Sequence, residues 1–547
     1  MSLNWSILQG LFYPLSFILI CLALYHYWQQ STRYVRLGRK LPGPKPIPLF
    51  GNALEALLMK PDDIAEYVLN KSKTDFKNNT IVGIWLGYKL YVGIINPEDV
   101  EIILGSQTHI QKSEEYRYFK PWLGDGLLIS RGEKWKNHRK IIAPTFHIHI
   151  LKTFINSLNN NGSSLVKRLE NEISNNFDIH DYMSRVTVDT LLETVMGIEK
   201  PKNETTSFDY ANAVLKLCTI IHNRHYKYWL QNDFIFKLTS LAGAQTHLIN
   251  VIHSLRNKIV KFKTEGVSLK LNTGESNSLP ISISDNGLND QGSNKNFYSF
   301  GSAVRDDLDE ADEIGEKKRR PFLEELIETK LTNTGSFTDE EINEEVDTIL
   351  FEGHDTTAAA MSFVLSLLGI HQAIQEKVFQ ELNAIFYDSE RSATFEDTVQ
   401  MKYLERVILE SLRLYPPVPM IARKLTEDVC LASERYVLPK GTTVVIGTYL
   451  LHRRPELYEN PDVFDPDNFL AEKCVGRHHY SYIPFSAGPR SCVGRKYAML
   501  KMKIILSSIL RKYKVYSDIS EKAFRLQGDI ILKRADGFKI RIENRLS

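Results

Sequence analysis

The feature that most constrains this chain is a short loop near its C-terminal end, FSAGPRSCVGRKYAML, which begins at Phe485. Gly488 and Gly494 permit a tight turn and a close approach of the backbone to a flat ligand. Between them, Cys492 follows the cation of Arg490, and a helix is predicted to begin just beyond, with the positive end of its dipole towards the sulfur. A lone cysteine is usually an inert core residue, but these neighbours predict one that is held as its thiolate.

A thiolate is a soft axial ligand for haem iron, and it favours cleavage of the O–O bond. The loop resembles the haem-binding signature of the cytochrome P450 superfamily, Phe-x-x-Gly-x-Arg-x-Cys-x-Gly, matched by Phe485, Gly488, Arg490, Cys492 and Gly494. The resemblance implies that these residues bind haem b, with Cys492 as the ligand of the iron. It also implies a mainly α fold with small β-sheets, the use of O2, and electrons from NADPH delivered by a flavoprotein reductase, with cytochrome b5 as a second candidate donor.

Composition alone excludes little. The 547 residues are 43% hydrophobic and 24% charged, which suits a globular protein with a large core. A formal net charge of +2 gives no reason to expect nucleic acid as a partner. The five cysteines are far apart and form no CxxC pair, which fits a reducing compartment and disfavours both a disulfide framework and a zinc site.

The N-terminal residues 1–32 contain no Asp, Glu, Lys or Arg, and residues 7–28 are almost wholly apolar or aromatic. A helix of this length could cross the hydrocarbon core of a bilayer, so we expect a single-pass membrane anchor. The alternative, a cleaved signal peptide, lacks its charged n-region and its small-x-small cleavage site. Basic residues follow on one side only, which places the rest of the chain in the cytosol; they are Arg33, Arg36, Arg39 and Lys40.

Residues 33–50 form a basic and proline-rich hinge, in which prolines at 42, 44, 46 and 48 favour a stiff, extended segment. Such hinges resemble those that follow the anchor of microsomal P450s, which implies the endoplasmic reticulum membrane. Residues 51–547 are then the catalytic domain. Within it, the alternation over residues 80–95 predicts a β-hairpin, and a second hairpin is expected around Gly537.

Two residues on a predicted helix, Trp135 and Arg139, stand one turn apart on the same face. In the P450 family a Trp-x-x-x-Arg at this place binds a haem propionate, and Arg423 aligns with a further propionate-binding position. The alternative for the first pair is a cation stacked on a surface tryptophan.

A long helix is predicted to begin after Thr338, where TDEE has the pattern of an N-cap with acidic residues in the first turn. On it, Glu352, Asp355 and Thr356 should share one face, while Gly353 leaves room for a close approach. In the family, Gly-x-Asp-Thr forms an oxygen-binding notch, which implies catalytic roles for Gly353, Asp355 and Thr356, with Asp355 and Thr356 delivering protons. Glu352 matches a glutamate that in some members esterifies a haem methyl group. An exposed polar stripe is the structural alternative.

Glu410 and Arg413 lie three positions apart on another predicted helix. In the family this Glu-x-x-Arg pair is structural and locks the core around the haem. Its usual third partner is an arginine, but Asn468 stands at that place, which puts a fully charged triad in doubt.

Basic residues on two helices should flank the thiolate side of the haem and attract an acidic reductase. An ordinary solvated face is the alternative. The residues are Lys134, Lys136, Lys140, Arg495, Lys496, Lys501 and Lys503.

Residues at about 267–316 form a polar, charge-rich insertion. An insertion there, together with FEGHDTT from Phe351 and longer stretches such as IPFSAGPRSCVGRKYAMLK, resembles family four of the P450s and, within it, subfamily G of insects. That resemblance implies oxidative decarbonylation of long-chain fatty aldehydes to cuticular hydrocarbons.

Three alternatives stay open at this point: ω-hydroxylation of fatty acids, monooxygenation of lipophilic hormones or xenobiotics, and a membrane-tethered haem sensor or lipid carrier. A zinc hydrolase is disfavoured, because no His-Glu-x-x-His occurs.

Overall fold

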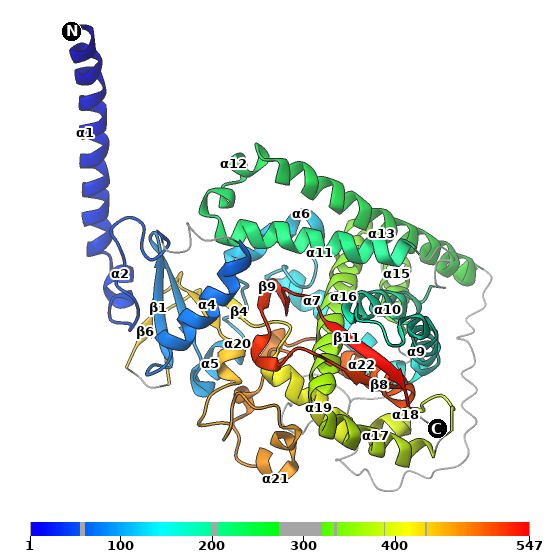
Figure 1. Ribbon diagram of the computed structural model, residues 1–547. Coiled ribbons are helices and arrows are strands. Elements are labelled where there is room, and N and C mark those ends of the chain that lie inside the picture. The colour runs from blue at the N-terminus through cyan, green and yellow to red at the C-terminus, as the bar shows by residue number, and fades with distance from the viewer. Residues whose placement is uncertain are drawn as a thin grey trace.

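The computed structural model describes residues 2–54, 61–198, 205–272, 320–332, 336–387, 389–432 and 435–545. These residues form a mainly helical body with small β-sheets at its edges, as expected (Figure 1). Most of the predicted insertion lies outside the described residues. Its first part, residues 267–272, continues helix α13, Ser240–Asn272.

The N-terminal helix α1, Ser2–Ser31, projects away from the body (Figure 1). Large apolar side chains are exposed along residues 12–28. The short helix α2, Arg33–Gly38, follows after an N-cap formed by Thr32. Among the residues that the structure describes, no single helix has the length and apolar composition needed to cross a membrane. Only α16, Asp339–Ile370, together with α17, Gln372–Phe386, meets that criterion, as a pair bent by 110°.

A four-stranded sheet forms one side of the body. The predicted hairpin at residues 80–95 is confirmed as β1, Ile81–Leu86, paired antiparallel with β2, Lys89–Ile94. Strand β7, Thr443–Ile446, runs parallel to β2, and β4, Ile421–Lys424, closes the sheet against β7. This sheet carries Arg423 towards the predicted haem loop.

The central element is α16, Asp339–Ile370, which begins with a capping box between Thr338 and Glu341, as its sequence predicts. Apolar residues surround most of it, because it packs against α10, Ile179–Glu193, and crosses α22, Arg495–Lys512 (Figure 1). Helix α19, Lys402–Leu414, also packs against it. Helices α16, α19 and α22 therefore pack against one another in the core.

The other helices of the described residues surround this core. They are α4 Pro61–Asp75, α5 Pro97–Leu104, α6 Lys120–Leu123, α7 Gly132–Ile142, α8 Ile148–Thr153, α9 Ile155–Leu169, α11 Thr205–Tyr226, α12 Asp233–Lys237, α15 Phe322–Thr332, α18 Phe395–Gln400, α20 Thr448–Leu451 and α21 Ala471–Cys474.

The C-terminal strands differ from the expected hairpin. A turn does occur at Gly537, but β10, Ile531–Arg534, pairs with β9, Leu526–Asp529. Strand β11, Lys539–Asn544, pairs instead with β8, Tyr513–Tyr516, and with β3, Phe177–Asp178. The predicted hairpin around Gly537 is wrong, because the two strands that flank it pair with other strands instead of with each other. The small sheet β5, Val429–Cys430, with β6, Val437–Leu438, completes the described strands.

Candidate functional site

The loop before α22 is held in one conformation by backbone contacts. The amide of Cys492 donates a hydrogen bond of 2.8 Å to the carbonyl of Phe485. Gly488 has a φ of 68°, and a Cβ there would lie 2.0 Å from the carbonyl oxygen of Leu104, so only glycine fits. A Cβ at Gly494, by contrast, would meet nothing within 4 Å. The loop is therefore packed tightly against Leu104 at Gly488, whereas space remains beside Gly494.

Cys492 faces the open side. Burial, and then the Glu352 carboxylate, raise the pKa of its thiol to about 11. Its side chain is nevertheless exposed, so the sulfur faces a space inside the protein. Burial outweighs the lowering of this pKa by the Gly494 backbone and Arg139, so the thiolate stays a prediction for the metal-bound form. A metal ion bound to a thiol does deprotonate it.

Arginines converge beside this loop from three elements. Arg490 donates to the carbonyls of Ile110 and Leu127, and its guanidinium lies 4.4 Å from the centre of the Trp135 ring. Arg139 of α7 donates to the backbone carbonyl of Ser491 at 2.8 Å. The fold thus brings the predicted residues Trp135 and Arg139 together with Arg490 of the cysteine loop.

Two further residues of this cluster carry no recognisable motif. Lys112 forms an isolated β-bridge with Arg423, and its ammonium lies 4.8 Å from the centre of the Tyr116 ring. Burial, and then Arg423 and Arg490, push the pKa of Lys112 well below its usual value. Sequence reasoning missed Lys112 and Tyr116, because only the fold brings their loop to β4.

The cluster contains more buried positive than negative charge. Lys112, Arg139, Arg423 and Arg490 influence one another, and Glu352 is the carboxylate among the described residues that influences Lys112, Arg490 and Cys492. Arg423 is 1% exposed, and its Nη2 has no hydrogen-bond partner. Buried cations require counter-charges, so this cluster fits an anionic ligand such as the two propionates of haem.

Helix α16 presents two different faces at the predicted notch. Glu352, Gly353 and Thr356 are partly exposed, although their neighbours Phe351 and Asp355 are buried. Burial raises the pKa of Glu352 to about 7, against the opposing effect of Lys112. The hydroxyl of Thr356 donates to the carbonyl of Glu352 at 2.7 Å. Glu352 and Thr356 thus lie on the open face.

The missing side chain of Gly353 serves helix packing. A Cβ there would lie 2.9 Å from Cδ2 of Leu191 on α10. The close approach expected at Gly353 is therefore made by a leucine.

Asp355 does not share the open face, so the prediction of one common face is wrong for this residue. It is fully buried and forms an ion pair of 2.6 Å with Lys533 of β10. Burial acts to raise the pKa of Asp355, but Lys533 and then His354 outweigh it and lower the pKa below its usual value. Burial also lowers the pKa of His180 to about 3 and that of His354 to about 4. Asp355 is therefore ionised behind α16, beside neutral histidines.

Glu410 and Arg413 form the expected buried pair. Nε of Arg413 lies 2.7 Å from Oε2 of Glu410, and both side chains are inaccessible to solvent. Arg413 also donates to the backbone carbonyls of His452, Pro461 and Val463. Asn468 donates to Glu410 at 3.1 Å, so a neutral amide takes the third place in the network.

The predicted basic surface is largely absent from α22. The four of its cations that were predicted to lie there, Arg495, Lys496, Lys501 and Lys503, are buried. Of the α7 lysines, Lys136 and Lys140 are exposed, whereas Lys134 pairs with Glu344. An exposed basic stripe along α22 is thus excluded, because α22 runs through the core.

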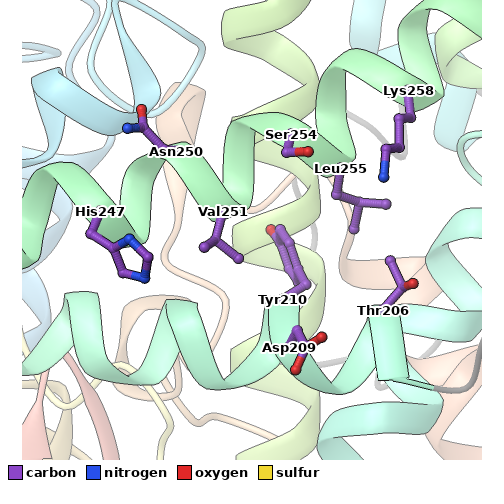
Figure 2. Close-up of a pocket in the computed structure, with 9 residues that line it drawn as sticks. All are labelled: Thr206, Asp209, Tyr210, His247, Asn250, Val251, Ser254, Leu255 and Lys258. Atoms are coloured by element: carbon purple, nitrogen blue, oxygen red, sulfur yellow. The ribbon is translucent and has the colours of Figure 1, made fainter.

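A surface pocket lies apart from this cluster, between α11 and α13 (Figure 2). Its lining includes Tyr210, His247 and Lys258 and none of the predicted site residues. The cluster of cations beside Cys492 is the better candidate site.

The geometry agrees with what sequence comparison finds. A family model described as Cytochrome P450 matches residues 41–541. The chain belongs to the cytochrome P450 family. Cytochrome P450 4g15 of Drosophila melanogaster is 48% identical to this P450 over 96% of the chain and 95% of the relative. Cytochrome P450 4g1 of the same fly is 47% identical over 96% and 93%. These relatives place the chain in family four.

More distant proteins agree. Human Cytochrome P450 4V2 is 34% identical over 94% of this chain and 92% of its own. A crystal structure of the cytochrome P450DA haem domain superposes with a TM-score of 0.70 over 92% of this chain and 98% of that chain, at 19% identity, and so shows the same fold.

This P450 is therefore a haem-thiolate oxidoreductase that uses haem b, O2 and electrons from NADPH through a reductase, and acts on lipophilic substrates. The residues present fit the cofactor: the side chain of Cys492 is accessible, a Cβ at Gly494 would meet nothing within 4 Å, and Nη2 of the buried Arg423 has no hydrogen-bond partner among the described residues.

Proposed function

We propose that this P450 converts long-chain fatty aldehydes to hydrocarbons that are one carbon shorter. The observation that carries the proposal is the identity of 48% and 47% to the two Drosophila 4g proteins, against 38% to Cytochrome P450 4c3 of the same fly. Stretches such as IPFSAGPRSCVGRKYAMLK, which contains Cys492, resemble insect subfamily G, and that subfamily is linked to this reaction.

The reaction consumes an aldehyde RCHO, one O2, two electrons and two protons, and it yields RH, CO2 and water. Haem with a cysteine ligand supplies the oxygen activation when bound. Two residues of α16 suit the delivery of these protons. Thr356 carries a hydroxyl on the open face, while Asp355 holds a carboxylate next to Lys533 on the other. We propose that Asp355 and Thr356 move protons, and that Trp135, Arg139, Arg423, Arg490 and Lys112 hold the propionates.

Product analysis tests the proposal. The purified holoenzyme with its reductase and NADPH is given octadecanal labelled at C1. We expect heptadecane and labelled CO2 in equal amounts, and neither from Cys492→Ser. Formation of an ω-alcohol or of the acid alone would reject decarbonylation.

The second candidate function is ω-hydroxylation of fatty acids. The observation that favours it is Glu352, which faces the site at the position where family-four members can carry an ester link to haem. Such a link would hold the ring rigidly against α16. Octadecanoic acid given under the same conditions would yield the ω-alcohol, and NADPH consumption that depends on substrate would exclude a haem sensor or a lipid carrier.

We also propose that residues 1–32 anchor the protein in the endoplasmic reticulum membrane, with the body in the cytosol. The support is the absence of charged residues in this segment, the projection of α1 from the body, and the exposure of Phe234 and Leu238 around α12 (Figure 1). A chain that begins at Arg33 should leave the pellet after carbonate extraction while the full chain stays. Equal extraction of both would contradict the anchor.

A further inference from the structure

Two fully buried lysines on α22 differ in what they contact. Nζ of Lys503 lies 2.6 Å from Glu405 and 2.8 Å from the carbonyl of Thr398, so its charge is balanced. Lys501 has no carboxylate at ion-pair distance among the described residues. Its hydrogen bond goes to the backbone carbonyl of Gly353 on α16, at 2.8 Å.

A buried ammonium without a counter-charge is costly for folding. Burial lowers the pKa of Lys501 to about 7, which reflects that cost. A methionine of similar length would fill the same space without it. A buried amine that donates to a neighbouring helix, where an apolar side chain would pack, therefore points to a task beyond packing.

The carbonyl of Gly353 lies in the turn that presents Glu352 and Thr356 to the open face. It accepts hydrogen bonds from Lys501 and from the hydroxyl of Thr357, both at 2.8 Å, in addition to its place in the helix. Because the hydroxyl of Thr356 also bonds back to its own helix, this turn is fixed by side-chain donors as well as by the helix itself.

The lysine side chain is itself held in place. Its ammonium lies 4.9 Å from the centre of the Tyr497 ring, and the Tyr497 hydroxyl lies 2.8 Å from Oγ1 of Thr194. The charge of Lys501 also acts on His354, the residue next to Asp355. Lys501 thus connects the helix that follows Cys492 with both faces of the α16 turn.

We propose that Lys501 is a positioning residue for oxygen chemistry. It carries a donor across the core from the cysteine-bearing side and holds the Gly353 carbonyl, so that Thr356 and Glu352 stay aligned towards the haem. The proposal rests on the oxygen-side role proposed above for Thr356, and it is independent of which substrate is oxidised.

The test is the fate of electrons in the haem-loaded, full-length enzyme with its reductase. NADPH consumption and H2O2 release are measured with octadecanal and with octadecanoic acid as probes. If the α16 turn that carries Glu352 and Thr356 is misaligned, a larger share of the electrons from NADPH should reduce O2 to H2O2, with either substrate. We expect Lys501→Met to bind haem with an unchanged ferrous-CO spectrum and KM, while H2O2 released per product rises about tenfold, as expected for the loss of one charged hydrogen bond.

Matched variants separate positioning from stability. Lys501→Arg, which keeps a charged donor, should stay within about twofold of wild type. Lys503→Met removes the other buried lysine of α22 and should lower the melting temperature without raising the H2O2 share. If Lys501→Met fails to load haem, Lys501→Gln replaces it, and coupling equal to wild type would overturn the inference.

A double-mutant cycle separates the proposed role of Thr356 in proton delivery from the proposed role of Lys501 in positioning it. If Lys501 acts through Thr356, Thr356→Ala should raise the H2O2 share, and adding Lys501→Met should change it little further. Additive effects would overturn the role of Lys501 in positioning Thr356. Unchanged coupling in Thr356→Ala would instead refute the role of Thr356, whereas an effect of Thr356→Ala with none of Lys501→Met would refute only the lysine.

Discussion

Replacement of Arg413 by alanine should prevent the formation of haem-loaded protein. The change leaves Glu410, which is inaccessible to solvent, without its ion-pair partner. Removing one partner of a buried pair costs about 3 to 5 kcal/mol. The carbonyls of His452, Pro461 and Val463 lose their donor as well, at about 1 kcal/mol or more each. The total approaches the whole stability of a typical domain, about 5 to 15 kcal/mol.

The assay is the ferrous-CO difference spectrum per mole of chain, with the melting temperature of whatever protein is recovered. A matched control lies on the same helix: Arg406 pairs with Asp467 at 2.9 Å, but both side chains are partly exposed. Such a pair is worth about 1 kcal/mol or less, so Arg406→Ala should load haem normally. Replacing both partners, Glu410→Leu with Arg413→Met, should recover part of the stability, because no charge is then buried alone. A haem-replete Arg413→Ala enzyme would refute the reasoning.

Three further changes give distinct outcomes. Gly488→Ala should destabilise the chain with or without haem, because its Cβ would lie 2.0 Å from a carbonyl oxygen. Gly494→Ala, whose Cβ would meet nothing within 4 Å, should leave the fold intact and weaken haem binding only. An equal loss of stability in both variants would contradict this placement of the cofactor. Cys492→Ser should fold and lose the thiolate-type band of the ferrous-CO spectrum, and a wild-type protein without that band would overturn the assignment of the ligand. The unfolding free energy should fall as pH drops from 6.5 towards 4, because the pKa of His354 in the folded chain is about 4 and the unfolded chain takes up the proton first. In urea titrations, His354→Gln should reduce the slope of unfolding free energy against pH by up to about 1.4 kcal/mol per pH unit. An unchanged slope would contradict burial of the neutral ring.

The sequence predicts the fold class and the individual pieces of the site, because these depend on local pattern. The cysteine loop, the capped start of α16 and the i, i+3 spacing of Glu410 and Arg413 are each contained within a few residues. Which of them meet is a matter of long-range packing, and there the prediction depends on resemblance to the family.

The residues that sequence reasoning misplaced are those whose partners lie far along the chain. Lys112 reaches β4, some three hundred residues away, and Lys533 turns Asp355 to the back of α16. Lys501 was expected at the surface because lysine usually is, yet α22 crosses the core. No local spacing encodes these contacts.

The surplus of buried cations around Arg423 has a consequence for the life of the protein in the cell. Because Lys112, Arg139, Arg423 and Arg490 repel one another, propionates bound there as proposed would stabilise the folded centre. By mass action, haem that binds only the folded chain would shift the folding equilibrium towards the folded state. Cells short of haem should clear this chain rapidly by proteolysis, so that the amount of enzyme follows haem supply as well as transcription.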